Sequence, residues 1–153
     1  MAYENLYTEY INSQTLEICE VDTKTSLSLQ FFDTGIQAGF PSPAEDYVDL
    51  AIDLNQELIK NPSSTFLGRV KGSSMKDAGI FEGDVLVIDK SKEPVDGSIA
   101  VCFLDGDFTV KRIKIHGRQC FLMPANQDFN PIEIQSDNDF RVWGIVTYII
   151  KKV

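Results

Sequence analysis

Short apolar runs separated by turn-forming residues fill the C-terminal part of the chain. Glycine, proline, asparagine and aspartate stand between the runs, which is typical of strands joined by short turns. The Val85–Ile88 run is apolar at every position, so it predicts a central strand that is buried on both faces. The whole pattern predicts six strands, over Phe66–Lys71, Asp84–Asp89, Ser98–Leu104, Phe108–Ile115, Cys120–Pro124 and Phe140–Val153.

A different spacing precedes these runs. Ser42–Glu45 has the pattern of a helix start, with a capping serine, proline at the first helical position and a glutamate close behind. Apolar residues then recur three or four positions apart, at Tyr47, Val48, Leu50, Ala51, Leu54 and Leu58. This spacing predicts one helix, or two short ones, over residues 43–60.

Residues 1 to about 40 are polar and mixed, and their short apolar pieces do not keep a helical period. We expect an N-terminal arm here instead of a helix-turn-helix domain, which needs several packed helices. The chain as a whole therefore predicts a mainly β fold. We expect a curled antiparallel sheet or small barrel with a short N-terminal helical segment and an extended N-terminal arm.

Composition and charge narrow the function classes. The 153 residues are 43% hydrophobic, which suits one domain with a sizeable core. There are 23 acidic and 14 basic side chains, for a net charge of -9, so we expect no direct binding to DNA. No apolar run is long enough to cross a membrane, and the first ten residues lack the basic start of a signal peptide. We expect a cytoplasmic protein without a membrane partner.

The thiols and the single histidine predict no metal site and no cofactor. Cys19, Cys102 and Cys120 show no Cys-x-x-Cys spacing, and two of them stand in apolar runs, so we expect reduced structural cysteines. His116 precedes Gly117 and is typical of a turn residue. With one histidine, neither a zinc site nor a Ser-His-Asp triad is well supported.

A serine and a lysine are the best candidates for chemistry. Alternation in the 108–115 strand places Lys111 on the face that holds Ile113 and Ile115. A lysine among apolar neighbours has a lowered pKa, and its neutral amine can take the proton of a serine hydroxyl.

Ser74 is the matching serine. It follows Gly72 and Ser73 and precedes an expected short helical stretch over 75–78 that Gly79 would cap. The backbone N–H groups of Ser73 and Ser74 would then form an oxyanion hole at a helix start. Taken alone, Ser74 also fits a helix N-cap and Lys111 an edge-strand lysine, and the residues by themselves leave these interpretations open.

Three ordered segments closely resemble the UmuD-like accessory proteins of the LexA/UmuD family of self-cleaving Ser-Lys peptidases. They are Gly39–Tyr47, Gly72–Met75 with Gly79-Ile80 and Gly83-Asp84, and Gly106–Lys111. The resemblance runs from about residue 36 to the C-terminus and includes Asp53–Gln56, Pro124–Asn126 and Val142–Val146.

This resemblance implies that Ser74 is the nucleophile, Lys111 the general base and Ala38–Gly39 the bond that is cut. It divides the chain into a removable arm, 1–38, and a peptidase and dimerisation domain, 39–153. In the family, a RecA filament on single-stranded DNA promotes cleavage during the SOS response. The product forms a homodimer that serves as accessory subunit to an error-prone, UmuC-like translesion DNA polymerase.

The chain departs from the UmuD pattern at three places. The arm before Ala38 is longer than in UmuD, yet too short for a LexA-type DNA-binding domain. Ser73 replaces a residue that is commonly acidic in UmuD, and Ala38 stands where UmuD often has cysteine.

Two alternatives to a self-cleaving UmuD-like protein remain. They are a non-catalytic dimeric β interaction module and a LexA-like or phage-repressor-like regulator that lacks its DNA-binding domain. A signal peptidase would require a membrane anchor.

Overall fold

The computed structural model describes residues 11–12, 16–26, 28–32 and 49–153. The chain divides into two compact units. The larger comprises Met1–Val21 and Asn61–Val153, and the smaller comprises Asp22–Lys60. No helix in the described ranges has the length and apolar character needed to cross a membrane.

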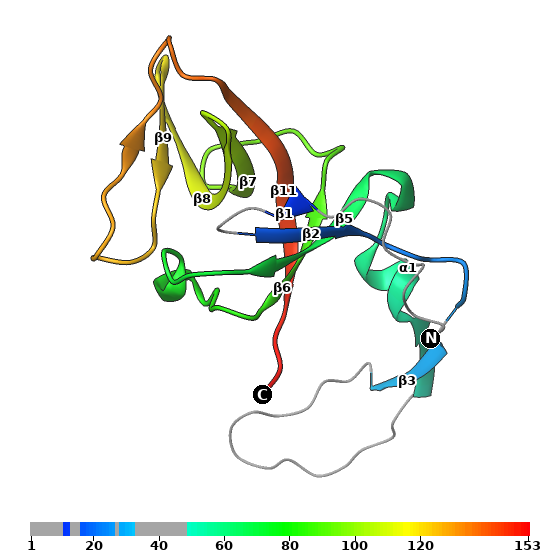
Figure 1. The fold of residues 1–153 in the computed structure, drawn as a ribbon. Helices are drawn as coiled ribbons and strands as arrows, with labels where there is room; N and C mark the ends of the chain where they lie inside the picture. Colours follow the sequence, from blue (N-terminus) through cyan, green and yellow to red (C-terminus); the bar gives the residue numbers. More distant parts are fainter. Residues whose placement is uncertain (1–10, 13–15, 27, 33–48) are drawn as a thin grey trace. The chain divides into compact units, whose positions relative to one another are not determined.

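In its described residues, the larger unit is built on one antiparallel sheet of nine strands, in the order β1-β2-β5-β6-β11-β7-β8-β9-β10 (Figure 1). The mainly β fold expected from the sequence is confirmed. The strands are β1 Ile11–Asn12, β2 Leu16–Glu20, β5 Thr65–Val70, β6 Val85–Asp89, β7 Ile99–Leu104, β8 Asp107–His116, β9 Gln119–Met123, β10 Ile132–Glu133 and β11 Phe140–Ile150. Two 3₁₀ turns, η1 Pro62–Ser64 and η2 Lys76–Ala78, also belong to this unit.

All six predicted strands are present, with ends that differ by a few residues. β6 lies between β5 and β11, and Leu86, Val87 and Ile88 are each at most 1% exposed, so the prediction of a central buried strand is confirmed. β7 and β8 are joined by Asp105 and Gly106, whose φ angles of 50° and 98° are those of a tight two-residue hairpin turn. This turn sets the register that places Lys111 opposite Ala100.

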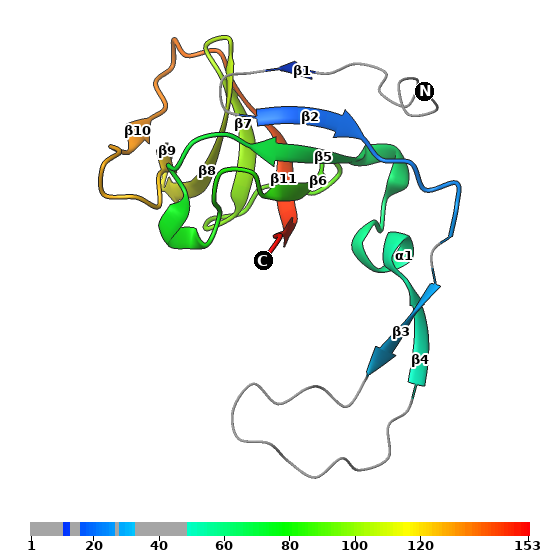
Figure 2. The ribbon, with the colours of Figure 1, turned by 60° about the horizontal axis from the view of Figure 1, so that its bottom comes forward.

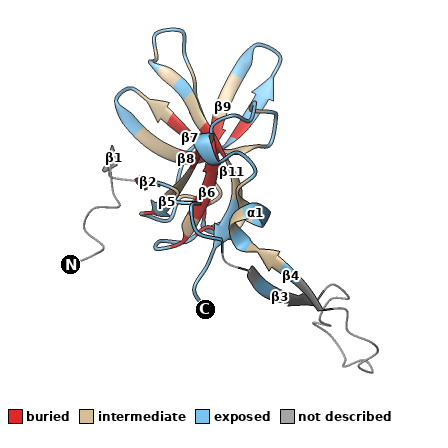
Figure 3. Cartoon of the chain, turned by 90° about the vertical axis from the view of Figure 1, so that its right-hand side faces the viewer, coloured by how far each residue is buried: buried red, intermediate tan, exposed pale blue. Residues whose placement is uncertain are grey.

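The sheet curls, so that strands far apart in its order share a core. Leu16 and Ile18 of β2 pack in the same cluster as Val110 of β8, although four strands separate β2 from β8. In the described residues, β1 and β10 end the order and do not pair with each other, so the sheet stays open. Figure 3 shows the buried residues gathered along the middle of the sheet, with exposed residues towards the hairpin ends.

The described residues 11–12 and 16–20 belong to the main sheet, which the sequence pattern does not predict. We expected residues 1 to about 40 to form an arm, but β2 pairs along its whole length with β5 (Figure 2). β1 extends the sheet by one further short strand. The alternation in Leu16–Glu20 spans only five residues, and its partner strand begins far along the chain at Thr65, so local pattern alone does not reveal the pairing.

In the part that the structure describes, the smaller unit holds a β-hairpin followed by a short helix. β3 Ser28–Phe32 pairs antiparallel with β4 Asp49–Asp53, and α1 follows at Leu54–Leu58. The Asp53 side chain caps this helix by accepting a hydrogen bond from the Asn55 N–H at 3.0 Å. Of the helix expected over 43–60, the described part is therefore helical only at Leu54–Leu58, because pairing with β3 makes Asp49–Asp53 a strand. The hairpin encloses residues 33–48.

Candidate active site

The structure brings Ser74 and Lys111 together. Lys111 Nζ lies 2.9 Å from Ser74 Oγ. The lysine comes from β8, whereas the serine lies in the loop between β5 and β6, so the pair is made by the fold and not by proximity along the chain. A nucleophile and a base at hydrogen-bond distance are the minimum that serine–lysine chemistry requires.

Lys111 lies in an apolar setting. Its side chain is only 7% exposed, and it faces the buried Ala100 across the strand pair. Burial lowers the pKa of Lys111 below its ordinary 10.5, although the nearby Cys102 acts in the opposite direction. The expected shared face is confirmed for Ile113, which is 2% exposed, but Ile115 near the strand end is 45% exposed.

Two further contacts orient the amine. Lys111 Nζ lies 2.7 Å from Thr109 Oγ1 and 3.0 Å from the Val110 carbonyl oxygen. A neutral amine has two hydrogens and one lone pair, and a carbonyl can only accept. If the two hydrogens are donated to Thr109 and Val110, the lone pair is left for the Ser74 hydroxyl. The geometry therefore suits proton transfer from Ser74 to Lys111.

A segment after β9 holds the Ser74 loop in place. Ala125 N–H donates to the Ser74 carbonyl at 2.8 Å, and Ala125 accepts from Asp77 N–H at 2.7 Å. The Asn126 side chain, 6% exposed, donates to the Ser73 carbonyl at 2.9 Å. Met75 adds an apolar anchor, since it is 3% exposed within the main core. The sequence pattern does not mark Asn126 as a site residue. The signal that could have found it is the resemblance to the family, because Pro124–Asn126 is one of the segments that carry it.

The backbone N–H groups of Ser73 and Ser74 make no hydrogen bond to another residue in the described part of the chain. The expected helical stretch is the single 3₁₀ turn η2, and Gly79 caps it with a φ of 79° as expected. One turn supplies little helix dipole, so any oxyanion binding would depend on the loop N–H groups themselves.

The other candidate residues lie apart from this pair or outside the described residues. His116 is exposed at the end of β8, before the turn at Gly117. Cys102 and Cys120 are unbridged thiols, and burial raises the pKa of Cys102 to about 12. Ala38 and Gly39 fall within the undescribed range 33–48. No cluster of metal-binding side chains stands among the described residues.

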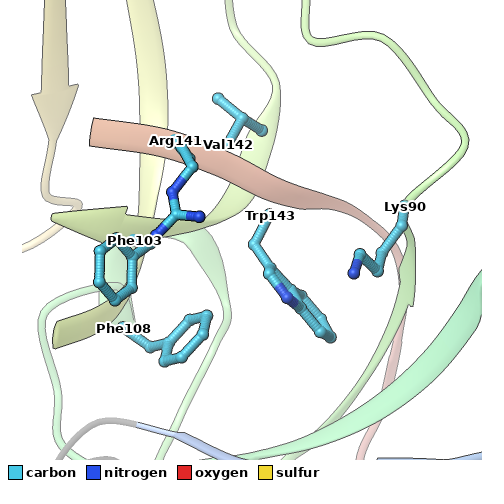
Figure 4. Close-up of a pocket in the computed structure, with 6 residues that line it drawn as sticks. All are labelled: Lys90, Phe103, Phe108, Arg141, Val142 and Trp143. Atoms are coloured by element: carbon cyan, nitrogen blue, oxygen red, sulfur yellow. The ribbon is translucent and has the colours of Figure 1, made fainter. Parts of the chain in front are cut away.

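A second concave surface has a different chemical character. A pocket of about 370 Å³ is lined by Lys90, Phe103, Phe108, Arg141, Val142 and Trp143 (Figure 4). Lys90 Nζ lies 4.6 Å from the centre of the Trp143 ring, and Arg141 Cζ lies 4.5 Å from that of Phe103. These cation–π contacts hold the cations over the aromatic rings. The described lining residues include no serine, cysteine or acidic side chain, so they offer no counterpart to the Ser74–Lys111 pair.

Comparison with known proteins assigns the family. The peptidase S24-like family matches residues 30–147. Protein MucA of Salmonella typhimurium is 44% identical over 122 residues, which cover 79% of this chain and 83% of MucA. Protein SamA of the same species is 42% identical over 117 residues, covering 75% and 79% of the two chains.

A LexA repressor extends the comparison to a longer protein. The repressor of Bordetella avium is 37% identical over 116 residues, which are 76% of this chain but only 54% of the repressor. The UmuD-like resemblance in the sequence is thus confirmed, and the chain belongs to the peptidase S24-like family.

Proposed function

We propose that this chain is a serine peptidase that cuts its own Ala38–Gly39 bond, with Ser74 as nucleophile and Lys111 as general base. The observation that carries this proposal is the 2.9 Å contact between Ser74 Oγ and a lysine amine that is buried and has a lowered pKa. Family membership supports the same reaction type.

In the proposed reaction, neutral Lys111 takes the Ser74 hydroxyl proton as Oγ attacks the Ala38 carbonyl carbon. The N–H groups of Ser73 and Ser74 bind the oxyanion. Lys111 then gives the proton to the Gly39 nitrogen, the C–N bond breaks, and residues 1–38 are held as an ester on Ser74. A water molecule, deprotonated by Lys111, hydrolyses this ester and regenerates the serine.

The substrate is part of the same chain. The β3–β4 hairpin encloses residues 33–48, and Ala38–Gly39 lies within that range. A tethered substrate is present at high effective concentration, so one slow, well-positioned turnover is sufficient. The small Ala38 and the permissive Gly39 suit close approach of a backbone to the serine. The proposal divides the chain into a cleaved segment, 1–38, and a retained domain, 39–153.

We further propose that cleavage is a regulatory step in SOS mutagenesis. Its trigger would be a RecA filament on single-stranded DNA, and its product a homodimer that acts as accessory subunit of an error-prone translesion polymerase. The similarity to MucA and SamA over most of their length supports this UmuD-like role. The net charge of -9 fits a protein that reaches DNA through protein partners.

Mapping of the cleavage products tests the peptidase. Purified full-length protein is incubated in mild alkali and followed by intact mass spectrometry. Wild type should yield a fragment that begins at Gly39, whereas Ser74→Ala should stay whole. Ser73→Ala is the matched control, because it removes a neighbouring hydroxyl and keeps every backbone N–H; it should still be cut. Identical fragments from wild type and Ser74→Ala would refute the proposal.

A second experiment separates the peptidase from the non-catalytic interaction module. Wild type and Ser74→Ala are incubated near neutral pH with RecA, ATP and single-stranded DNA. Cleavage of wild type alone supports the regulated peptidase. An uncut chain that nevertheless binds a translesion polymerase would favour the interaction module.

A further inference from the structure

β2 precedes the proposed scissile bond, yet it is a strand of the main sheet. Its five residues pair with β5 in unbroken register, from Leu16 opposite Val70 to Glu20 opposite Phe66. Both strands lie in the same compact unit. The segment that cleavage would separate from the domain therefore supplies an interior component of that domain.

The packing of β2 resembles a protein core and not a surface contact. Leu16 is 0% exposed and Ile18 is 2% exposed, and both belong to the main core cluster. Gly68 of β5 makes the fit possible. A Cβ at that position would lie 2.9 Å from Leu16 Cδ1 and also 2.9 Å from Ile88 Cδ1. The missing side chain at Gly68 thus leaves the space that the Leu16 side chain occupies.

Scission at Ala38–Gly39 would break none of these contacts. Loss of β2 would leave the β5 edge unpaired and would open a cavity beside Gly68 and Ile88. We propose that residues 1–38 stay bound to residues 39–153 after cleavage, with Leu16–Glu20 held as a noncovalent strand against β5. This inference rests on the proposed self-cleavage.

On this proposal, cleavage and release are separate events. Cutting frees the chain end at Gly39 while the β5 edge remains covered. Release then requires another extended segment to displace β2 from the edge, in the manner of strand addition. The β5 edge is a strand-binding site whose resident ligand is the chain's own Leu16–Glu20.

The test cuts the chain independently of its own chemistry. A recognition site for a sequence-specific protease is inserted into the 33–38 segment of full-length Ser74→Ala. After digestion, native size-exclusion chromatography with intact mass spectrometry should find both fragments co-eluting one to one, and denaturant should separate them. Elution of the N-terminal fragment alone from the native column would overturn the proposal.

Matched variants show whether β2 is responsible. Leu16→Ser with Ile18→Ser should release the N-terminal fragment after digestion, whereas Glu20→Ser, at an exposed position of the same strand, should retain it. Equal retention in all three chains would overturn the assignment to β2. A further test uses the protease-cut Ser74→Ala chain with β2 unchanged, so it needs no destabilising substitution. It measures hydrogen exchange of the backbone amides. The β5 amides should stay protected, and rapid exchange there would contradict the proposal.

Running wild type on the same native column distinguishes failure of the self-cleavage proposal from failure of the retention proposal. If wild type never cuts itself, the proposed function fails, while the protease-cut chain still reports whether the arm is retained. If wild type cuts itself and the arm departs at once, the peptidase proposal survives and the retention proposal fails.

Discussion

Lys111 is held in a setting that disfavours its charged form, with Ala100 opposite and Ile113 on the same face. Among the described residues its hydrogen-bond partners are Ser74, Thr109 and the Val110 carbonyl, and none of these is an acid. A buried ammonium without a carboxylate partner costs stability. The same burial lowers the pKa of Lys111 and so favours the neutral amine that the chemistry needs, which means that stability and chemistry place opposite demands on this position.

Lys111→Met should therefore stabilise the fold near pH 7. Because the folded-state pKa is lowered from 10.5, the folded chain binds fewer protons than the unfolded chain between the two pKa values. Wild-type stability should rise with pH across that window and level off above 10.5, so the advantage of Lys111→Met should shrink as pH rises. Urea unfolding followed by Trp143 fluorescence at several pH values measures this. An advantage that is constant from neutral pH to pH 11 would contradict it.

At the residue scale, the sequence predicts that a serine and a lysine carry the chemistry and which strand face holds Lys111. It does not predict the distance between Ser74 Oγ and Lys111 Nζ. Alternation alone places Lys111 beside Ile113, and the buried Ile113 agrees. No local pattern can say that Ser74 lies within 2.9 Å of the lysine, because that contact depends on the β5–β6 loop crossing to β8. The Asn126 bond to Ser73 has the same non-local origin.

At the element scale, β11 is the strand that joins the two halves of the sheet. It pairs with β6 on one side and β7 on the other, and its register shifts on both sides between Val142 and Tyr148. Gly144 lies at one of these irregularities. A Cβ there would come 2.6 Å from Ile88 Cγ2, so the strand can approach β6 only with glycine at this position.

Gly144→Ala should destabilise the domain by about 1–3 kcal/mol, which is the usual cost of overpacking a core. Thermal unfolding monitored by circular dichroism checks this. Lys114→Ala, at an exposed position of β8, is the control and should change stability little. If the thermal unfolding midpoint of Gly144→Ala equalled that of Lys114→Ala, the space between β11 and β6 would accommodate a Cβ and the prediction would be wrong.

The strands that the sequence predicts are those with alternation or an apolar run of their own, including β11, whose partners β6 and β7 are not next to it in the chain. In β7, β8 and β9 the alternation or the apolar run is long enough to predict a strand, and tight turns join β7 to β8 and β8 to β9. β2 and β4 are different, since β2 finds its partner in β5 and β4 in β3 across the enclosed 33–48 range. The helical spacing near Leu50 and Leu54 is real, but strand pairing prevails at Asp49–Asp53.

At the scale of the whole molecule, two buried carboxylates connect distant parts of the larger unit. Asp84, 6% exposed, forms an ion pair with Lys151 near the C-terminus and accepts from Phe81 N–H at 2.9 Å. Asp89, 4% exposed, accepts from Ser91 N–H at 2.8 Å and from the Asn61 side chain at 2.9 Å. Burial acts to raise both pKa values, but these partners outweigh it and hold each pKa below 3.8.

Their stabilising contribution should be present above pH 3.8 and should be lost as pH falls through the lowered folded-state pKa values. Asp84→Asn should cost about 1–3 kcal/mol at pH 7, because it removes the buried carboxylate that pairs with Lys151 and accepts from the Phe81 N–H. It should also flatten the acid limb of the stability curve. Denaturant titrations between pH 2 and pH 7 measure both effects. If the free energy of unfolding of Asp84→Asn fell with decreasing pH as steeply as that of wild type, groups other than Asp84 would be responsible for the acid sensitivity.

We propose that Ser74 and Lys111 act together on the chain's own Ala38–Gly39 bond. The most direct measurement is the rate of appearance of the 39–153 fragment as a function of pH, by intact mass spectrometry, for wild type, Ser74→Ala and Lys111→Ala. The wild-type rate should rise with pH and reach its plateau below pH 10.5, because burial lowers the pKa of the lysine, and both variants should form no such fragment. A Lys111→Ala chain that is cut at the wild-type rate with the same pH profile would contradict the account.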